Sequence, residues 1–301
     1  MARPPAVSTS DDERTPLAEG VALQKAGDLA QAFRRFQDAA KDADPRVAAE
    51  ALRRQASIYR LRSKWTEAVA ATRESADLAR SHGHVDLEAE ALNAEAIVYQ
   101  VRGVFEDALP LLNRVLELVG ATHPKIRGNA LQNLGAIAAQ QGDFPTARRR
   151  FLEAAEAFRK ADYFWGEANV LNNFARAALD HGNFPLAADM LRNAHSAAKR
   201  VGDKDLISLS LMNLAEATLG LGDPRQAQDQ AEEALMFFAA EDNAPRKIEC
   251  LRILGDIFSA QQMLDAAISC WEQALLLATE HEASSELRKL EPRLVEARNK
   301  A

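Results

Sequence analysis

Four polar side chains near the middle of the chain have the types and the spacing that most clearly indicate a binding role. Asn169, Asn172, Asn173 and Arg176 are spaced i, i+3, i+4 and i+7, which places them on one face of a helix. An amide offers both a hydrogen-bond donor and an acceptor, so it suits a peptide bond without dictating the ligand's side chain. The set is therefore suited to hydrogen bonding with a peptide backbone.

Other kinds of chemistry have no support in the sequence. There is no phosphate-binding glycine loop, zinc-ligand spacing or nucleophile elbow, and nothing selects a catalytic pair among the 44 acidic residues. His82 and His84 lie close together, but the linker that holds them offers no further metal ligands. We expect no enzyme activity, no metal and no cofactor.

Composition and charge narrow the class of partner. The chain has 301 residues and a net charge of −7; residues 1–150 hold 21 Lys/Arg and 20 Asp/Glu, which leaves 16 against 24, or −8, for the rest. Nucleic-acid binding needs a basic surface, so this balance argues against it. Met1 to Gly20 has no apolar signal core, no stretch reaches about 18 apolar residues, and we expect a cytoplasmic protein without a membrane partner. Cys250 and Cys270 are expected to be reduced, buried thiols.

A repeat of about 40 residues supplies the helices that position these groups. Its turn position is occupied by Gly27, Ser63, Gly103, Gly142, Gly182, Gly222 and Gln262. Five residues later stands alanine every time, namely Ala32, Ala68, Ala108, Ala147, Ala187, Ala227 and Ala267. Seven residues earlier stands glycine or alanine, namely Gly20, Ala56, Ala96, Gly135, Ala175, Ala215 and Gly255. Periodicity in this range is typical of a solenoid, and solenoids mostly bind other molecules.

Each repeat is predicted to form two amphipathic helices around the turn. In the fourth repeat they run near Lys125–Gln141 and Pro145–Lys160, because apolar residues recur there at helical spacing. The small positions predict close helix crossings, and the turns at Ser63 and Gln262 are expected to be irregular. A bulky residue two places after the turn is expected to fill the gap between the two helices of its repeat, as Phe144 would. Residues 284–299 are predicted to form one more helix, which Pro292 either kinks or begins.

This pattern resembles the tetratricopeptide repeat family. The likeness rests on Gly135, Gly142, Phe144, Ala147, Phe151 and Ala154, and the long period is similar to that of LGN-type and kinesin-light-chain-type adaptors. The resemblance implies an all-α fold, a right-handed α-solenoid of seven helix pairs plus a C-terminal capping helix. The expected boundaries are a disordered tail at 1–14, repeats at 15–45, 46–83, 84–122, 123–162, 163–202, 203–242 and 243–282, and the capping helix at 283–301.

The resemblance also implies that the first helices of the repeats line a concave groove. Asn133, Asn173 and Asn213 stand nine residues before the turn, where an asparagine in the family can bond a ligand backbone or serve helix contacts. An apolar patch is expected at Leu209 and Met212, where a flexible methionine could accept a partner side chain. The full set of expected partner-binding residues is Asn129, Gln132, Asn133, Asn169, Asn172, Asn173, Arg176, Met212, Asn213 and Arg252.

The favoured function is a non-enzymatic scaffold or adaptor that holds a peptide or protein segment in this groove. Two alternatives remain open from the sequence: a peptide-sensing regulatory protein, and a structural repeat protein that assembles with itself. All three predict a protein or peptide partner, with homo-oligomers possible.

Overall fold

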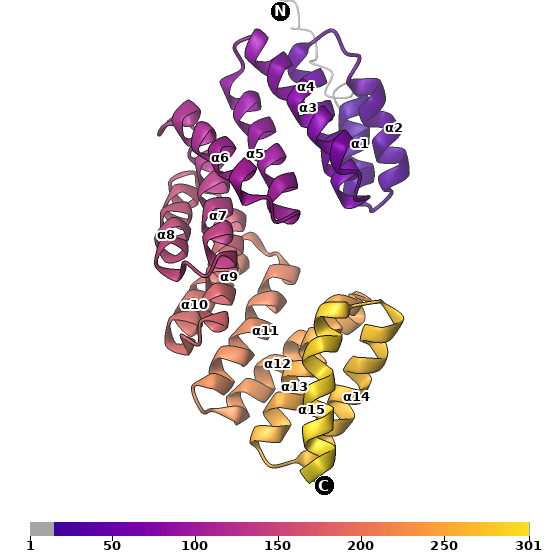
Figure 1. Cartoon of the computed structure of the whole chain (residues 1–301), viewed down its shortest axis with the longest axis vertical. Coiled ribbons are helices and arrows are strands. Elements are labelled where there is room, and N and C mark those ends of the chain that lie inside the picture. The colour runs from indigo at the N-terminus through magenta and orange to yellow at the C-terminus, as the bar shows by residue number, and fades with distance from the viewer. Residues whose placement is uncertain (1–14, 301) are drawn as a thin grey trace, which may run out of the picture. The chain divides into compact units, whose positions relative to one another are not determined.

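The computed structural model describes residues 15–300, and within them the chain forms fifteen α-helices and no strand (Figure 1). The helices are α1 (Pro16–Lys25), α2 (Leu29–Ala39), α3 (Pro45–Leu61), α4 (Trp65–Ser81), α5 (Val85–Val101), α6 (Phe105–Val119), α7 (Pro124–Gln140), α8 (Phe144–Lys160), α9 (Phe164–Asp180), α10 (Phe184–Val201), α11 (Lys204–Gly220), α12 (Pro224–Ala240), α13 (Ala244–Ala260), α14 (Leu264–Glu280) and α15 (Ser284–Lys300). The predicted all-α class is confirmed. The tail predicted for residues 1–14 lies outside the described residues.

The chain divides into two compact units within α7. The N-terminal unit ends at Ile137, and the C-terminal unit begins at Ala138. Within each unit, consecutive helices pack against one another, and the first helix of a repeat also contacts the first helix of the next, as α3 contacts α5. No helix in the described range is long and apolar enough to cross a membrane.

Every turn between the two helices of a repeat has a residue with positive φ. The glycines reach φ values from 73° at Gly103 to 87° at Gly222. Ser63 and Gln262 adopt the same conformation, with φ of 55° and 63°, so the expectation that these two turns are irregular was wrong. The C-terminal end of the first helix requires a positive φ at this position, so Ser63 and Gln262 adopt the left-handed conformation despite their β-carbons.

Gln262→Gly is expected to raise the free energy of unfolding by about 0.5–1 kcal/mol, because glycine adopts positive φ without a steric penalty. The reciprocal change Gly222→Gln should lower it by about 1 kcal/mol. Urea unfolding followed by circular dichroism measures both. Equal midpoints for Gln262→Gly and the wild type would show that this turn is not strained.

The small residues lie where the two helices of a repeat cross. Ala175 and Ala187, from α9 and α10, are fully buried. Glycine appears where the opposing residue is a large aromatic: a β-carbon on Gly20 would lie 2.5 Å from the Phe36 ring, and one on Gly255 would lie 2.4 Å from the Trp271 ring. The regular recurrence of small residues along the sequence therefore reflects a packing requirement at the helix crossings.

Ala187→Leu should destabilise the protein by about 1–3 kcal/mol, because the crossing of α9 and α10 has no room for three more carbon atoms. The thermal unfolding midpoint measures the effect. Arg192→Leu, at an exposed position of the same helix, is the control and should change stability little.

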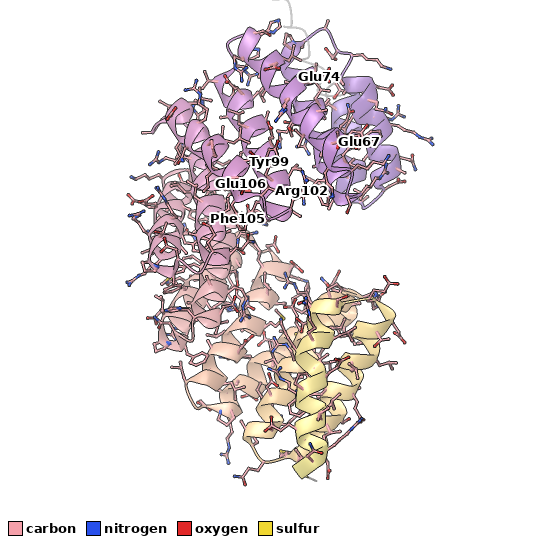
Figure 2. All side chains as sticks on the ribbon, in the orientation of Figure 1. Glu67, Glu74, Tyr99, Arg102, Phe105 and Glu106 are labelled. Carbon is pink, nitrogen blue, oxygen red and sulfur yellow. The ribbon has the colours of Figure 1, made fainter. Side chains whose placement is uncertain are left out.

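The bulky residues after the turn pack against the following repeat. Phe144 stacks on His181, with ring centroids 4.4 Å apart, and Phe184 lies so close to Gly220 that a β-carbon there would be 2.3 Å from its ring. Phe184 packs on a core cluster that joins Ala175 and Leu179 of its own repeat to Leu214 and Ala217 of the next. These aromatic residues therefore fill the gap inside their own repeat and also cover the end of the next repeat's first helix. In the N-terminal unit Phe105 and Tyr99, both labelled in Figure 2, pack on the same core cluster.

Helix α15 packs on α13 and α14 but has no second helix of its own among the described residues. Leu290 and Leu294 are buried against α14, while Val295 is 62% exposed. Val295 stands forty residues after Gly255, at the position that is small and buried in the seven repeats. Pro292 lies inside the helix, which begins eight residues earlier at Ser284, so this proline does not mark its start.

Candidate functional site

The first helices of the last repeats form a continuous surface in the C-terminal unit. Helix α9 contacts α11, α11 contacts α13, and α13 contacts α15. A pocket of about 400 Å³ opens on this surface. It is lined by Asn172, Asn173, Arg176, Asp180, Leu209, Asn213, Arg246, Glu249, Arg252, Ser285, Glu286 and Lys289. Half of the ten residues predicted to bind a partner therefore lie around one pocket: Asn172, Asn173, Arg176, Asn213 and Arg252.

Asparagine side chains in this pocket also bond one another. Asn172 is 3% exposed, and its amide donates to the Ala168 carbonyl and to the Ser210 hydroxyl, each at 3.0 Å. Asn213 donates to the Asn172 carbonyl oxygen at 3.4 Å. Asn173 is half-buried and donates to Asn169 at 3.4 Å. The buried amides thus join α9 to α11, while Asn173 stays accessible to a ligand.

The remaining predicted asparagines belong to the N-terminal unit. Asn133 donates to the Asn93 carbonyl oxygen at 3.0 Å, across one repeat. Asn129 and Gln132 are half-buried on the same helix. The Asn133–Asn93 and Asn213–Asn172 bonds join equivalent positions. In each, the donor stands nine residues before the turn of its repeat, and the acceptor stands ten residues before the turn of the preceding repeat. Part of the asparagine pattern therefore serves contacts between repeats.

Met212 is not available to a partner. Its side chain is 1% exposed and belongs to the core formed by α11, α12 and α13. The expectation that it forms a flexible apolar patch in the groove was wrong, because α12 covers this face of α11. Its companion Leu209 is partly exposed and does line the pocket.

Arg176 and Arg252 are held by carboxylates on four helices. Arg176 donates to Asp180 at 2.8 Å and to Glu216 at 2.9 Å. Arg252 is 5% exposed and uses all three guanidinium nitrogens, which contact Glu286 at 3.0 Å, Asp256 at 3.4 Å and Glu216 at 3.5 Å. This network, which we call the arginine network, links α9, α11, α13 and α15.

The charges in the arginine network stabilise one another in their ionised forms. Burial alone would raise the pKa of Glu216, but hydrogen bonds and charges from Arg176 and Arg252 outweigh it and hold the pKa below its ordinary value. Burial would lower the pKa of Arg176, and Glu216 together with Asp180 instead raises it. Both groups therefore remain charged at neutral pH.

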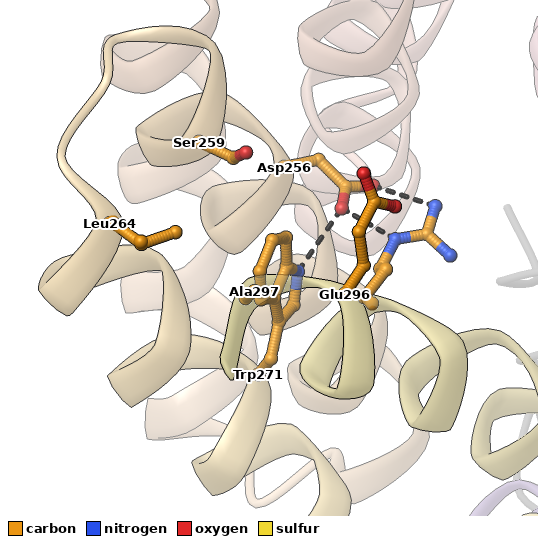
Figure 3. Close-up of a pocket in the computed structure, with 7 residues that line it drawn as sticks. Asp256, Ser259, Leu264, Trp271, Glu296 and Ala297 are labelled. Carbon is orange, nitrogen blue, oxygen red and sulfur yellow. Dashed lines mark hydrogen bonds and ion pairs between the residues drawn. The ribbon is translucent and has the colours of Figure 1, made fainter. Parts of the chain in front are cut away.

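A second cluster fastens α15 beside the pocket. Asp256 accepts from the Trp271 indole at 3.1 Å and from Arg293 at 2.6 Å and 3.0 Å, as the dashed lines in Figure 3 mark. The indole also lies 3.3 Å from the Arg252 carbonyl oxygen, to which it donates. The side chains that hold α15 in place are thus joined directly to the arginine network.

Sequence reasoning predicted Arg252 on α13 but missed the other pocket residues of α13 and all those of α15. Glu249 and Arg246 lie about one and two turns before Arg252, and Ser285, Glu286 and Lys289 belong to the terminal helix. The sequence does indicate that α15 continues the series of first helices, because Glu249 and Lys289 stand forty residues apart at equivalent positions of α13 and α15. The terminal helix was interpreted only as a cap, since it has no turn residue from which to count.

Comparisons with known proteins agree with this architecture. A model described as Tetratricopeptide repeat matches residues 87–160, 126–200 and 166–238, which together span about half of the chain. Among curated proteins, no sequence matches this chain.

Several solved structures share the fold at low sequence identity. Aspartyl phosphate phosphatase F from Bacillus subtilis is 13% identical, with a TM-score of 0.66 over 87% of this chain and 69% of its own. BtubC (BKLC) from P. vanneervenii is 19% identical, with a TM-score of 0.58 over 77% of this chain and 93% of its own. A Rap protein complexed with competence and sporulation factor is 16% identical, with a TM-score of 0.64 over 98% of this chain and 77% of its own.

Proposed function

Because this chain belongs to the tetratricopeptide repeat family, we propose that it is a non-enzymatic scaffold that binds a peptide segment of a partner protein. The peptide lies across the first helices of the C-terminal unit, over the pocket lined by α9, α11, α13 and α15. Asn173 donates to and accepts from the peptide backbone, and the arginine network holds the helices at the spacing that the peptide requires.

The observation that carries this proposal is the polar pocket itself. Its lining contains the buried polar groups Asn172, Asn213 and Arg252 and only one large apolar side chain, Leu209. Such a lining suits a peptide backbone better than an apolar small molecule, since each ligand amide needs a hydrogen-bond partner once water is displaced. Most side chains that surround the pocket are already ordered by one another, which lowers the entropy lost on binding.

The double variant Asn173→Ala/Arg176→Ala should weaken peptide binding at least about tenfold, because it removes one accessible amide and one organising cation. The ligands are peptides selected on the wild-type chain from a displayed library of random dodecapeptides, with affinity measured by calorimetry. Helical circular dichroism should be unchanged. Arg225→Ala, at an exposed position of α12 away from the pocket, is the control. Unaltered affinity in the double variant would remove the proposed site.

A second candidate is a peptide-sensing regulator, in which the bound peptide changes the arrangement of the repeats. The similarity to the Rap protein solved with competence and sporulation factor, over 98% of this chain, favours its consideration. Small-angle scattering with and without a selected peptide separates the two: a scaffold keeps its scattering profile, and a sensor changes it. Sedimentation of the pure chain tests the third candidate, self-assembly.

A further inference from the structure

We propose that the exposed side of α12 and α14 binds a basic amphipathic helix of a partner protein. This inference goes beyond the proposed function, because the surface belongs to the second helices of the last two repeats and the pocket belongs to the first helices. We call this surface the acidic face. It comprises the exposed residues of 223–242 and 263–282, which are α12, α14 and the turn residues beside them.

The acidic face concentrates negative charge that the chain itself leaves unpaired. Residues 223–242 and 263–282 hold ten acids and one arginine, a net charge of −9, which exceeds the whole excess of −8 in residues 151–301. The corresponding segments of the two preceding repeats, 143–162 and 183–202, together carry +3. In the described structure only Glu272 of the ten forms an ion pair, with Arg298 at 2.7 Å. All ten are exposed, namely Asp223, Asp229, Glu232, Glu233, Glu241, Asp242, Asp265, Glu272, Glu280 and Glu282.

Large apolar side chains lie exposed among these acids. Met236 and Leu276 are 76% and 61% exposed, and they stand forty residues apart at the same position of α12 and α14. The two preceding second helices have the polar residues Ser196 and Glu156 there. A single exposed apolar residue needs no explanation, but here two occupy equivalent positions of neighbouring helices. Each stands between half-buried apolar residues that add to the same surface, namely Leu235 and Phe237, and Leu275 and Leu277.

Helices α12 and α14 lie close enough to present one surface. Leu235 of α12 packs on the core cluster to which α13, α14 and α15 contribute. Burial, and after it the charge of Glu232 on α12, raises the pKa of the Cys270 thiol on α14. Glu232 and Met236 are one turn apart on α12, so they share a side of that helix. The carboxylates and the apolar side chains therefore belong to a single surface.

Charge complementarity identifies the occupant as a cationic segment. Lysine and arginine side chains give exposed carboxylates short, charge-assisted hydrogen bonds. Apolar side chains on the same segment cover Met236 and Leu276, and a methionine adapts its shape to the side chains that it meets. A partner that has both features along one strip is a basic amphipathic chain segment.

A helix is the conformation that this face suits. A helix satisfies its own backbone hydrogen bonds, so it needs only charge and apolar contact from the surface. An extended peptide also needs donors for its backbone carbonyl groups. The Gln228 and Gln273 amides already donate within the face, to Glu232 at 2.8 Å and to Ser269 at 3.3 Å, and carboxylates only accept.

A fluorescein-labelled model peptide tests the proposal by fluorescence anisotropy with the full chain. The probe has about 18 residues of leucine, lysine and alanine, which make five helical turns with the leucines on one face. Its scrambled isomer has the same composition and charge but no apolar face. The wild type should bind the amphipathic peptide at least about tenfold more tightly than the isomer, because only the former covers the apolar side chains.

Met236→Ser/Leu276→Ser should weaken binding of the amphipathic peptide at least about tenfold and leave circular dichroism unchanged, since both side chains are exposed. The control is Leu152→Ser, which removes an exposed leucine from α8 and should bind as the wild type does. Glu232→Gln/Glu233→Gln should weaken binding about threefold at low salt, and less as salt screens the charges. The same change on α8, Glu153→Gln/Glu156→Gln, should have no effect.

Equal affinity for the scrambled isomer, or wild-type affinity in the double serine variant, would reduce the binding to unspecific attraction of opposite charges and overturn the proposal. Sedimentation of the pure chain tests a different occupant, a second copy, since α8 is itself a helix with five basic residues and the exposed Leu152. A wild-type dimer that the double serine variant converts to a monomer would assign the face to self-association and overturn the partner helix. Neither outcome affects the pocket on the first helices.

Discussion

Arg252→Met is expected to lower the free energy of unfolding by about 3–5 kcal/mol, the range for breaking a buried ion pair from one side. Methionine fills a similar volume, but Glu216, Asp256 and Glu286 lose the guanidinium that neutralises them. Glu286 suffers most, because its side chain, 12% exposed, is the most buried of the three carboxylates. The midpoint of urea unfolding and the hydrogen exchange of α15 measure the change.

The difference in unfolding free energy between the wild type and Arg252→Met should decrease as the pH falls. Glu216 has a folded pKa below its ordinary value, so its contribution to stability is present above about pH 4.3, the unfolded pKa, and is lost as the pH falls through the folded pKa. The gap between wild type and Arg252→Met should therefore narrow in acid. Glu249→Gln, which removes a partly exposed pair on the same helix, is the control and should cost less than about 1 kcal/mol. A loss that small for Arg252→Met would show that the arginine network does not stabilise the unit.

Gly255→Ala is expected to cost about 3 kcal/mol, the upper end of the range for overpacking. In an ordinary helix position this change stabilises, because alanine has the higher helix propensity. Here the new methyl group would lie 2.4 Å from the indole of Trp271. The ring cannot move away freely, since its nitrogen donates to the Arg252 carbonyl oxygen and to Asp256.

A double-mutant cycle isolates this clash. In Trp271→Leu the space opposite Gly255 opens, so adding Gly255→Ala to that variant should cost little or raise stability slightly. A loss of the same size in both backgrounds would assign the effect to the helix backbone and not to the indole. The thermal unfolding midpoints of the four proteins complete the measurement.

The sequence predicted the helices well because their signals are local. The turn glycines and the alanines five residues later placed the fourth repeat's helices at Lys125–Gln141 and Pro145–Lys160, within a residue of α7 and α8. Positive φ at Gln262 could not be read from its side chain. It follows from the Schellman-type ending that the two neighbouring helices impose.

The sequence predicted the candidate site only in part, because the contacts of its side chains depend on residues far apart in the chain. Helical spacing correctly placed Asn172, Asn173 and Arg176 near one another, but it could not decide which amide turns toward α11. That depends on Ser210, thirty-eight residues away, which accepts from Asn172. Met212 shows the same limit, since its burial is due to α12 and α13 and not to its own helix.

The exposed valine of α15 distinguishes this helix from the first helices of the seven repeats. In the seven repeats the equivalent residue is glycine or alanine, and a second helix lies directly over it. A helix that approached Val295 at the same distance would meet two additional methyl groups, whichever chain it came from. Close packing of a further helix over this face, at the distance found in the seven repeats, is therefore disfavoured.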